Sequence, residues 1–321
     1  MNSLGVFTSG GDSPGMNAAI RAVVRSGLRN NMKIFGIRHG YEGMIDGDIF
    51  EMNGCDVANI ISRGGTILRT ARSKRFMTKQ GREKAYENLN KYGIEGIIGI
   101  GGDGTFHGLK DMINETSFKT IGLPGTIDND LFGTEATIGY DTACNTAMEA
   151  IDKIKDTASS HERIFLVEVM GRHAGFIGLE TGIATGAEDV LIPETPTDFK
   201  ALVKVLEKRI REGKKSAIVV VAEGDEMGGA FDAEREIKKL SNLKTRVTIL
   251  GHIQRGGSPT MRDRVLATRL GYHAVEALLE GKSGVMVGIC KGSVVFIPIE
   301  DTFNKKKIVE QDEIKMMPFL L

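Results

Sequence analysis

Short apolar segments alternate along the chain with longer segments whose apolar residues recur at helical spacing. The run 4–8 precedes a helical pattern over 16–29, and the run 94–100 precedes another over 106–113. This alternation of strand and helix is the repeating unit of parallel α/β folds. We expect strands at 4–8, 94–100, 118–123, 164–169, 190–192, 216–222 and 246–250, and helices at 16–29, 106–113, 141–155, 174–184, 199–210, 234–240 and 262–279.

The number of alternations bears on domain count. At least seven strand and helix pairs are too many for one compact small domain. A length of 321 residues also agrees with about two domains of roughly 150 residues each. No segment rich in proline, glycine and serine divides the chain, so we predict two α/β domains between which the chain crosses several times.

The charge balance excludes several classes of partner. Forty-two basic and 42 acidic side chains leave a net charge of zero, so no overall field attracts nucleic acid or an anionic membrane. The three cysteines, Cys55, Cys144 and Cys290, lie far apart, which argues against a disulfide framework and fits a reducing cytoplasm. No apolar stretch approaches the ~20 residues of a spanning helix. We therefore expect a cytoplasmic protein that binds neither nucleic acid nor a membrane.

Three glycine-rich stretches, at 8–17, 99–108 and 122–130, each follow an expected strand. In open α/β sheets the carboxyl ends of strands face the ligand crevice, so we expect the three stretches in one cleft. Gly10 and Gly11 allow backbone N–H groups to approach an anion closely. The alternative for the first stretch, taken alone, is a tight turn between strand and helix.

Two familiar nucleotide motifs do not fit. Gly99, Gly101 and Gly104 form a GxGxxG, but the ribose-binding acid expected roughly 20 residues later is missing. A Walker A loop ending at residues 281–283 fails because Glu276 stands where its first glycine belongs. Dehydrogenase and P-loop functions are therefore disfavoured.

The carboxylates in the glycine stretches indicate phosphoryl transfer. Asp103 lies in an anion-binding turn, which makes sense if Mg²⁺ stands between acid and phosphate. Asp128 and Asp130 occupy alternate positions, so they share a face in an extended segment and diverge in a turn. One of them is suited to accept a proton and the other to help hold the metal. Alternatively, both cap backbone N–H groups in an Asx turn.

Five motifs in order carry a family resemblance: TSGGDSPGMNAAIR from residue 8, GGDGT from 101, GLPGTIDND from 122, VEVMGR from 167 and LGHIQRGGSP from 250. Together they resemble bacterial ATP-dependent 6-phosphofructokinases over most of the chain to about residue 300. The resemblance implies two Rossmann-like three-layer α/β domains facing each other across the active site. It implies a larger ATP-binding domain at 1–139 with 254–304, and a smaller fructose 6-phosphate domain at 140–253 with 305–321.

The resemblance also implies residue roles. The ATP positions are matched by Gly11, Tyr41, Arg72, Ser73, Gly102, Asp103, Gly104 and Thr105, with Mg²⁺ at Asp103 and Asp130. The fructose 6-phosphate positions are matched by Thr126, Ile127, Asp128, Met170, Gly171, Arg172, Glu223, His252 and Arg255. Asp128 matches the catalytic base, and Arg72, Arg172 and Thr126 complete the catalytic set. Arg163 and Arg246 match arginines that reach the sugar phosphate from a neighbouring subunit of a homotetramer.

Effector binding is the point at which this sequence departs from the family. The family's positions for binding ADP or phosphoenolpyruvate are matched in this chain by Arg21, Arg25, Glu188, Lys214 and Lys215, and Lys155 stands where the family has an arginine. Gly54, Glu212 and Ser216 replace an arginine, a lysine and a histidine. Fewer cations and a new anion predict a weak phosphate site. Ser73 also differs from the usual residue of the nucleotide segment.

The phosphoryl donor is indicated by two glycines. Relatives that use pyrophosphate tend to carry an acid at the position of Gly104 and a lysine at that of Gly125. Glycine at 104 leaves room for the α-phosphate, so we expect ATP. Two alternatives remain: another small-molecule kinase with a GGDGT turn, and a catalytically silent nucleotide-binding regulator. The presence of Asp103, Asp128 and Asp130 argues against the regulator.

Overall fold

The computed structural model describes residues 1–161, 163–214 and 216–320, which form two compact units. Unit 1 comprises Met1–Ile127, Leu131–Thr142 and Arg255–Lys307, and unit 2 comprises Asp128–Asp130, Ala143–Gln254 and Ile308–Leu321. The chain therefore crosses between the units repeatedly. None of the helices in the described residues combines the length and apolar character needed to span a membrane.

Unit 1 is built on a seven-stranded sheet with the order β11-β10-β5-β4-β1-β2-β3. Its strands are β1 (Ser3–Thr8), β2 (Lys33–Ile37), β3 (Ile49–Met52), β4 (Gly96–Gly101), β5 (Lys119–Pro124), β10 (Val285–Cys290) and β11 (Ser293–Pro298). The five central strands pair in parallel, and β3 and β11 pair antiparallel at the two edges. The central strands are almost continuously apolar because both faces of the sheet are covered.

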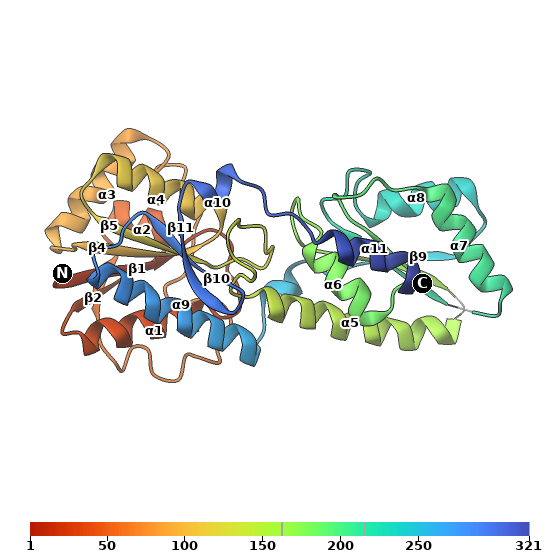
Figure 1. The fold of residues 1–321 in the computed structure, drawn as a ribbon, viewed down its shortest axis with the longest axis horizontal. Helices are drawn as coiled ribbons and strands as arrows, with labels where there is room; N and C mark the ends of the chain where they lie inside the picture. Colours follow the sequence, from red (N-terminus) through yellow and green to blue (C-terminus); the bar gives the residue numbers. More distant parts are fainter. Residues whose placement is uncertain (162, 215, 321) are drawn as a thin grey trace. The chain divides into compact units, whose positions relative to one another are not determined.

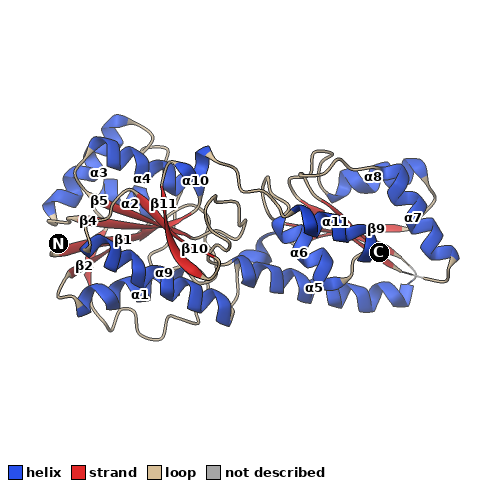
Figure 2. Ribbon diagram, in the orientation of Figure 1, coloured by secondary structure: helices blue, strands red, loops and turns tan. Residues whose placement is uncertain are grey.

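Helices cover both faces of this sheet, giving three layers (Figures 1 and 2). On one face, α1 (Met16–Arg29) and α9 (Met261–Leu279) pack together over a core that includes Ile20, Val23 and Leu270. The other face carries a second core. Its helices are α2 (Gly40–Asp46), α3 (Lys79–Lys91), α4 (Asp103–Glu115) and the short α10 (Asp301–Asn304).

Unit 2 has a parallel four-stranded sheet with the order β7-β8-β6-β9. Its strands are β6 (Ile164–Val169), β7 (Asp189–Leu191), β8 (Ala217–Ala222) and β9 (Thr245–Ile249). Its helical segments are α5 (Tyr140–His161), α6 (Phe176–Thr185), α7 (Phe199–Arg211), α8 (Ala230–Leu240), the 3₁₀ turn η1 (Gly251–Arg255) and α11 (Gln311–Leu320). One core lies between the sheet and α7 and α8, and α6 packs against the opposite face (Figure 2).

The α/β class predicted from the sequence is confirmed, and all fourteen expected elements exist. The helix expected at 16–29 has those bounds, whereas α4 begins three residues earlier than expected, at Asp103. The sequence reading missed β2, β3, α2, α3, β10, β11, α10 and α11. Of these, α2 and α10 are short and β3 is a four-residue edge strand, whereas β10 and β11 are apolar segments that could have been predicted.

Candidate active site

The glycines of the three turns lie side by side in unit 1, as predicted, whereas Asp128–Asp130 at the end of the third stretch belong to unit 2. Ser9 N–H donates to the Ile100 carbonyl at 3.1 Å, and Gly125 N–H donates to the Gly101 carbonyl at 2.9 Å. The Thr105 hydroxyl donates to the Ser9 carbonyl at 3.2 Å. These bonds follow from the strand order, because β1, β4 and β5 are neighbours whose carboxyl ends share one edge of the sheet.

Glycine is required where these turns approach one another. A Cβ on Gly101 would lie 2.2 Å from the Thr105 hydroxyl and 2.5 Å from the Ser9 carbonyl oxygen. Gly10 has a φ of 84°, a left-handed conformation that favours glycine. A Cβ on Gly104 meets nothing within 4 Å, so the space above that residue is open. The turns therefore present backbone N–H groups and the N-terminus of α4 to an anion.

Asp103 is the first residue of α4, and its side chain is 40% exposed. His107, one turn further along the helix, brings its Nε2 to 3.4 Å from the Asp103 carboxylate. The described residues contain no cluster of three or more acidic, histidine or cysteine side chains that could hold a metal by themselves. Mg²⁺ commonly uses one or two carboxylates together with substrate phosphates and water, so one exposed aspartate fits a metal that arrives with its nucleotide.

Tyr41 supports the turn from beneath. It is only 4% exposed, and its hydroxyl donates to the Thr105 carbonyl at 2.6 Å. Burial raises the pKa of this hydroxyl well above its ordinary value, so it stays protonated as a donor. Its ring stacks on Phe76 with a centroid distance of 4.1 Å. The family resemblance predicts that Tyr41 contacts ATP. The structure shows in addition that the Tyr41 hydroxyl is buried against the glycine turn that contains Thr105.

The segment 69–76 crosses the same edge of the sheet. The Thr70 hydroxyl donates to the Gly10 carbonyl at 2.7 Å, which places the segment against the first glycine turn. Arg72 is exposed, and its side chain makes no hydrogen bond or ion pair with the described residues. Ser73 donates its hydroxyl to Glu42 at 2.5 Å. Thr70 and Glu42 were not recognised from the sequence, because their partners lie far along the chain.

Arg255 was grouped with the sugar residues from the sequence, and the structure places it on the first glycine turn. Its Nη1 donates to the Asp12 carbonyl at 3.3 Å. A Cβ on Gly11 would lie 2.4 Å from the same nitrogen, so a side chain there would displace the guanidinium from this position. The predicted sugar contact of Arg255 stays a prediction.

A second group of predicted residues lies at the carboxyl ends of the parallel strands β6, β8 and β9 in unit 2. Glu223 accepts from the backbone N–H groups of Gly171 at 3.3 Å and Arg172 at 2.8 Å. Gly171 and Arg172 both have positive φ, at 149° and 55°. A strained turn of this kind persists only where its neighbours fix it, and the Glu223 carboxylate does so. The structure thereby brings Met170, Gly171, Arg172 and Glu223 together.

Gln254 belongs to this group although the sequence reading overlooked it. Its side chain is fully buried, and its Oε1 accepts from Met170 N–H at 2.9 Å. Residues 170, 171 and 172 thus donate three successive backbone N–H groups to two side chains, those of Gln254 and Glu223. His252 lies two residues earlier, in the same turn η1. Its place in the GHIQR segment, between the predicted residues His252 and Arg255, is the sequence feature that could have identified Gln254 as part of the site.

The residues after β5 form a turn. Asn129 has a φ of 54°, so the segment carrying Asp128 and Asp130 is not extended and the two carboxylates do not share a strand face. Asp128 is 4% exposed and Ile127 is fully buried. Thr126 lies beside Gly102, since a Cβ on that glycine would be 3.5 Å from the Thr126 Cβ. The carbonyl of Thr126 accepts from the Thr137 hydroxyl at 2.6 Å.

Arg163 and Arg246 lie elsewhere in unit 2. Arg163 immediately precedes β6, and Arg246 is the second residue of β9. Both therefore stand at the amino ends of their strands, whereas Met170 and His252 follow the carboxyl ends. A six-residue strand spans about 17 Å. Within one unit, therefore, the two arginines lie about one strand length from the predicted sugar-binding residues at the opposite ends of these strands.

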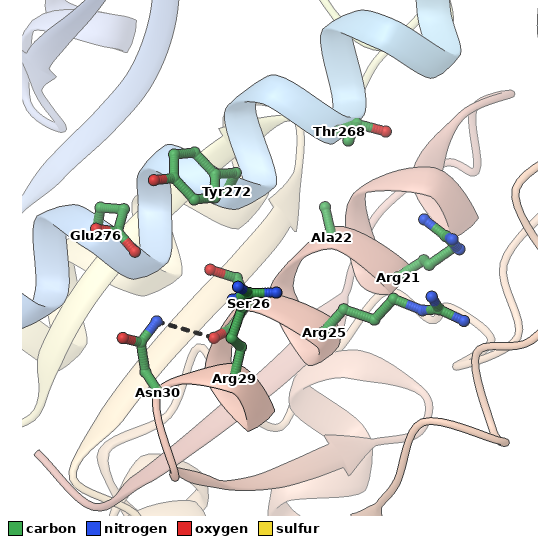
Figure 3. A pocket seen from close by; sticks show the side chains of 9 residues that line it. All are labelled: Arg21, Ala22, Arg25, Ser26, Arg29, Asn30, Thr268, Tyr272 and Glu276. Atoms are coloured by element: carbon green, nitrogen blue, oxygen red, sulfur yellow. Dashed lines mark hydrogen bonds between the residues drawn. The ribbon is translucent and has the colours of Figure 1, made fainter.

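The expected effector residues fall into both units. Arg21 and Arg25 line a cavity of about 420 Å³ between α1 and α9, with Tyr272 and Glu276 on the facing helix (Figure 3). In unit 2, Lys214 forms an ion pair with the buried Glu188. Lys155 lies on α5, and Lys215 lies outside the described residues. Glu212, one of the departures, lies within 4 Å of the cations of its helical neighbours Lys208 and Arg209.

Comparisons with known proteins agree with this arrangement. The sequence profile of the family described as Phosphofructokinase matches residues 3–278. The chain is 56% identical over 320 residues to "ATP-dependent 6-phosphofructokinase 1" of Thermus thermophilus, covering 100% of this chain and 99% of that protein. It is 54% identical over 312 residues to the ATP-dependent 6-phosphofructokinase of Bacillus pumilus, covering 97% of each.

Solved structures show the same likeness. Phosphofructokinase of Pichia pastoris in the T-state matches with a TM-score of 0.87 and 37% identity, over 94% of this chain and 35% of that one. The chain thus spans about a third of the yeast chain's length. A pyrophosphate-dependent phosphofructokinase of Marinobacter aquaeolei matches with a TM-score of 0.84 at 22% identity, over 100% of this chain and 91% of that one, and this likeness concerns the fold alone.

Proposed function

Because the chain belongs to the phosphofructokinase family, we propose that it is an ATP-dependent 6-phosphofructokinase of glycolysis. It transfers the γ-phosphoryl group of ATP to the 1-hydroxyl of fructose 6-phosphate, giving fructose 1,6-bisphosphate and ADP. The observation that carries this proposal is the adjacency of the three glycine turns, with Asp103 at the start of α4 and Tyr41 fixing the turn from beneath.

The nucleotide side binds and orients the phosphates. Backbone N–H groups at Gly11, Gly102 and Gly104 face the anion, and the positive end of the α4 dipole adds to their attraction. The open space at Gly104 supports ATP, whose α-phosphate needs the room that a side chain would fill. Arg72 is exposed and carries no internal partner among the described residues, so its guanidinium is available to the phosphoryl group during transfer.

Mg²⁺ is the cofactor we propose, with Asp103 as its principal protein ligand and Asp130 as a second carboxylate. When bound with ATP, the metal neutralises charge on the β- and γ-phosphates. The exposed position of Asp103 supports this assignment.

The acceptor side holds the sugar and removes its proton. Asp128 accepts the proton of the 1-hydroxyl as that oxygen attacks the γ-phosphorus, which general-base catalysis requires. Arg172 supplies positive charge, and the turn from which it projects is fixed because Met170 N–H donates to Gln254 and Arg172 N–H donates to Glu223. Thr126, Ile127, Met170, Gly171, His252 and Arg255 complete the proposed sugar contacts.

We propose that the protein works as a cytoplasmic homotetramer whose sugar sites are shared between subunits. This proposal is supported by the position of Arg163 and Arg246 at the amino ends of their strands. They lie about one strand length from the predicted sugar-binding residues of their own unit. Arginines placed there serve a sugar phosphate bound by a neighbouring copy. No nucleic acid partner is expected.

The decisive experiment is to measure product formation from fructose 6-phosphate with Mg²⁺ and either ATP or pyrophosphate. We expect turnover with ATP alone. Turnover with pyrophosphate alone would overturn the assignment of the donor. Absence of turnover with both donors would refute the proposed function and favour a different kinase or a silent regulator.

A further inference from the structure

The segment 69–76, which carries Arg72, is fixed at three points within unit 1. The first point is a turn at Arg69, whose φ of 56° is left-handed and therefore costs free energy in a residue with a side chain. The Thr8 hydroxyl donates to the carbonyl of Arg69 at 2.7 Å, and the Thr70 hydroxyl donates to the Gly10 carbonyl at 2.7 Å. The end of β1 thus holds the strained residue at its carbonyl, and the glycine turn holds the residue that follows it.

The second point lies immediately after Arg72. The Ser73 hydroxyl donates to Glu42 Oε1 at 2.5 Å and accepts from Phe76 N–H at 3.0 Å. Glu42 Oε2 accepts from Arg75 at 2.9 Å, so the carboxylate binds the segment twice. The Glu42 side chain is only 22% exposed, and hydrogen bonds to a charged acceptor are stronger than neutral ones.

The third point connects the segment to the phosphate turn itself. The Phe76 ring stacks on Tyr41, the residue before Glu42 in α2. Tyr41 in turn donates to the Thr105 carbonyl. The segment, α2 and the GGDGT turn therefore form one connected assembly within unit 1.

We propose that Thr70, Ser73 and Glu42 are positioning residues that hold Arg72 at the phosphate turns before the nucleotide binds. This inference rests on the proposed function, in which Arg72 faces the transferring phosphoryl group. Arg72 itself has a long, exposed side chain with no partner among the described residues, so the backbone on either side must supply its orientation. A small misplacement of such a group costs up to ~100-fold in rate.

The test is a double-mutant cycle. We expect Ser73→Ala to lower kcat with ATP about tenfold, since it removes the bond that follows Arg72 while leaving the guanidinium in place. In an Arg72→Ala background the same change should alter kcat less than about twofold, because nothing remains to be positioned. Ser73→Thr retains the hydroxyl and should restore most of the rate, and KM for fructose 6-phosphate should not change.

Asp46→Asn is the matched control. Asp46 accepts from Arg75 at 2.9 Å but does not contact Ser73, so its change should leave kcat near the wild-type value. Equal effects of Ser73→Ala in both backgrounds, or no effect in either, would overturn the inference. Full activity of Arg72→Ala would instead refute the role of Arg72, and an inactive wild type would refute the proposed function. Either result would also overturn the inference. Thermal unfolding of each variant checks that the fold is intact.

Discussion

Gly108 on α4 provides a sharp test of the packing beneath the phosphate turn. A Cβ at this position would lie 2.5 Å from Tyr41 Cζ and 2.6 Å from its hydroxyl oxygen. The tyrosine cannot easily move away, because its ring stacks on Phe76 at 4.1 Å and its hydroxyl is bonded to Thr105. We therefore expect Gly108→Ala to destabilise the protein although alanine is the better helix former.

The magnitude follows from two opposing effects. Overpacking a tight core costs about 1–3 kcal/mol, whereas replacing glycine by alanine in a helix gains about 0.5–1 kcal/mol. The difference of these ranges is about 0–2.5 kcal/mol, so the net destabilisation should be about 1 kcal/mol. For a domain of roughly 150–250 residues, 1 kcal/mol lowers the midpoint of thermal unfolding by about 2–4 °C.

Gly104→Ala is the control on the same helix. Nothing lies within 4 Å of its Cβ, so this change should leave the unfolding midpoint unchanged or raise it. Thermal unfolding without nucleotide compares the two variants directly. In a Tyr41→Leu background the clash is relieved, and Gly108→Ala should no longer destabilise. A stable Gly108→Ala protein, or the same cost with and without Tyr41, would refute the reasoning.

Four further predictions concern catalysis, donor choice, pH and regulation. Asp128→Ser should lower turnover by ~10²–10⁴-fold with ATP binding nearly intact, and near-normal turnover would remove Asp128 as the base. Gly104→Asp should impair ATP use severely, and an unchanged apparent affinity for ATP would contradict the steric argument. Hydrogen bonding to Arg82 holds the pKa of Glu115 below its ordinary value, so the ion pair should stabilise the fold at neutral pH and lose its effect as the pH falls through that lowered pKa. Urea unfolding of Glu115→Gln should show a cost of about 0.5–1 kcal/mol at about pH 7 that shrinks below about pH 4, and a cost independent of pH would count against it. Phosphoenolpyruvate should shift the fructose 6-phosphate saturation curve little or not at all, and a large shift would show that the replacements at Gly54, Glu212 and Ser216 leave the effector site functional.

Some elements escaped the sequence reading although a local signal was present. The hairpin of β10 and β11 turns at Lys291 and Gly292, both with positive φ, and a residue followed by glycine between apolar runs is a recognised hairpin signal. The helix α3 begins with the Thr78 side chain accepting from Gly81 N–H, but its surface is largely polar, so its apolar stripe is narrow. The hairpin extends one end of the seven-stranded sheet, and α3 packs on one of its faces. The central strands of this sheet were predicted from their apolar runs.

The sequence by itself determined the α/β class, the central strands and the residues that carry the phosphofructokinase motifs, because each depends on spacing along one short stretch of chain. It also determined that the three glycine turns meet, since parallel strands end at one edge of their sheet. Only the tertiary structure decided how these residues are held. The bond from Arg255 to the Asp12 carbonyl, the buried bond from Tyr41 to the Thr105 carbonyl, and the bond from Met170 N–H to Gln254 join residues that are 64 to 243 positions apart. Such contacts depend on the packing of whole elements against one another, which leaves no periodic trace in the chain.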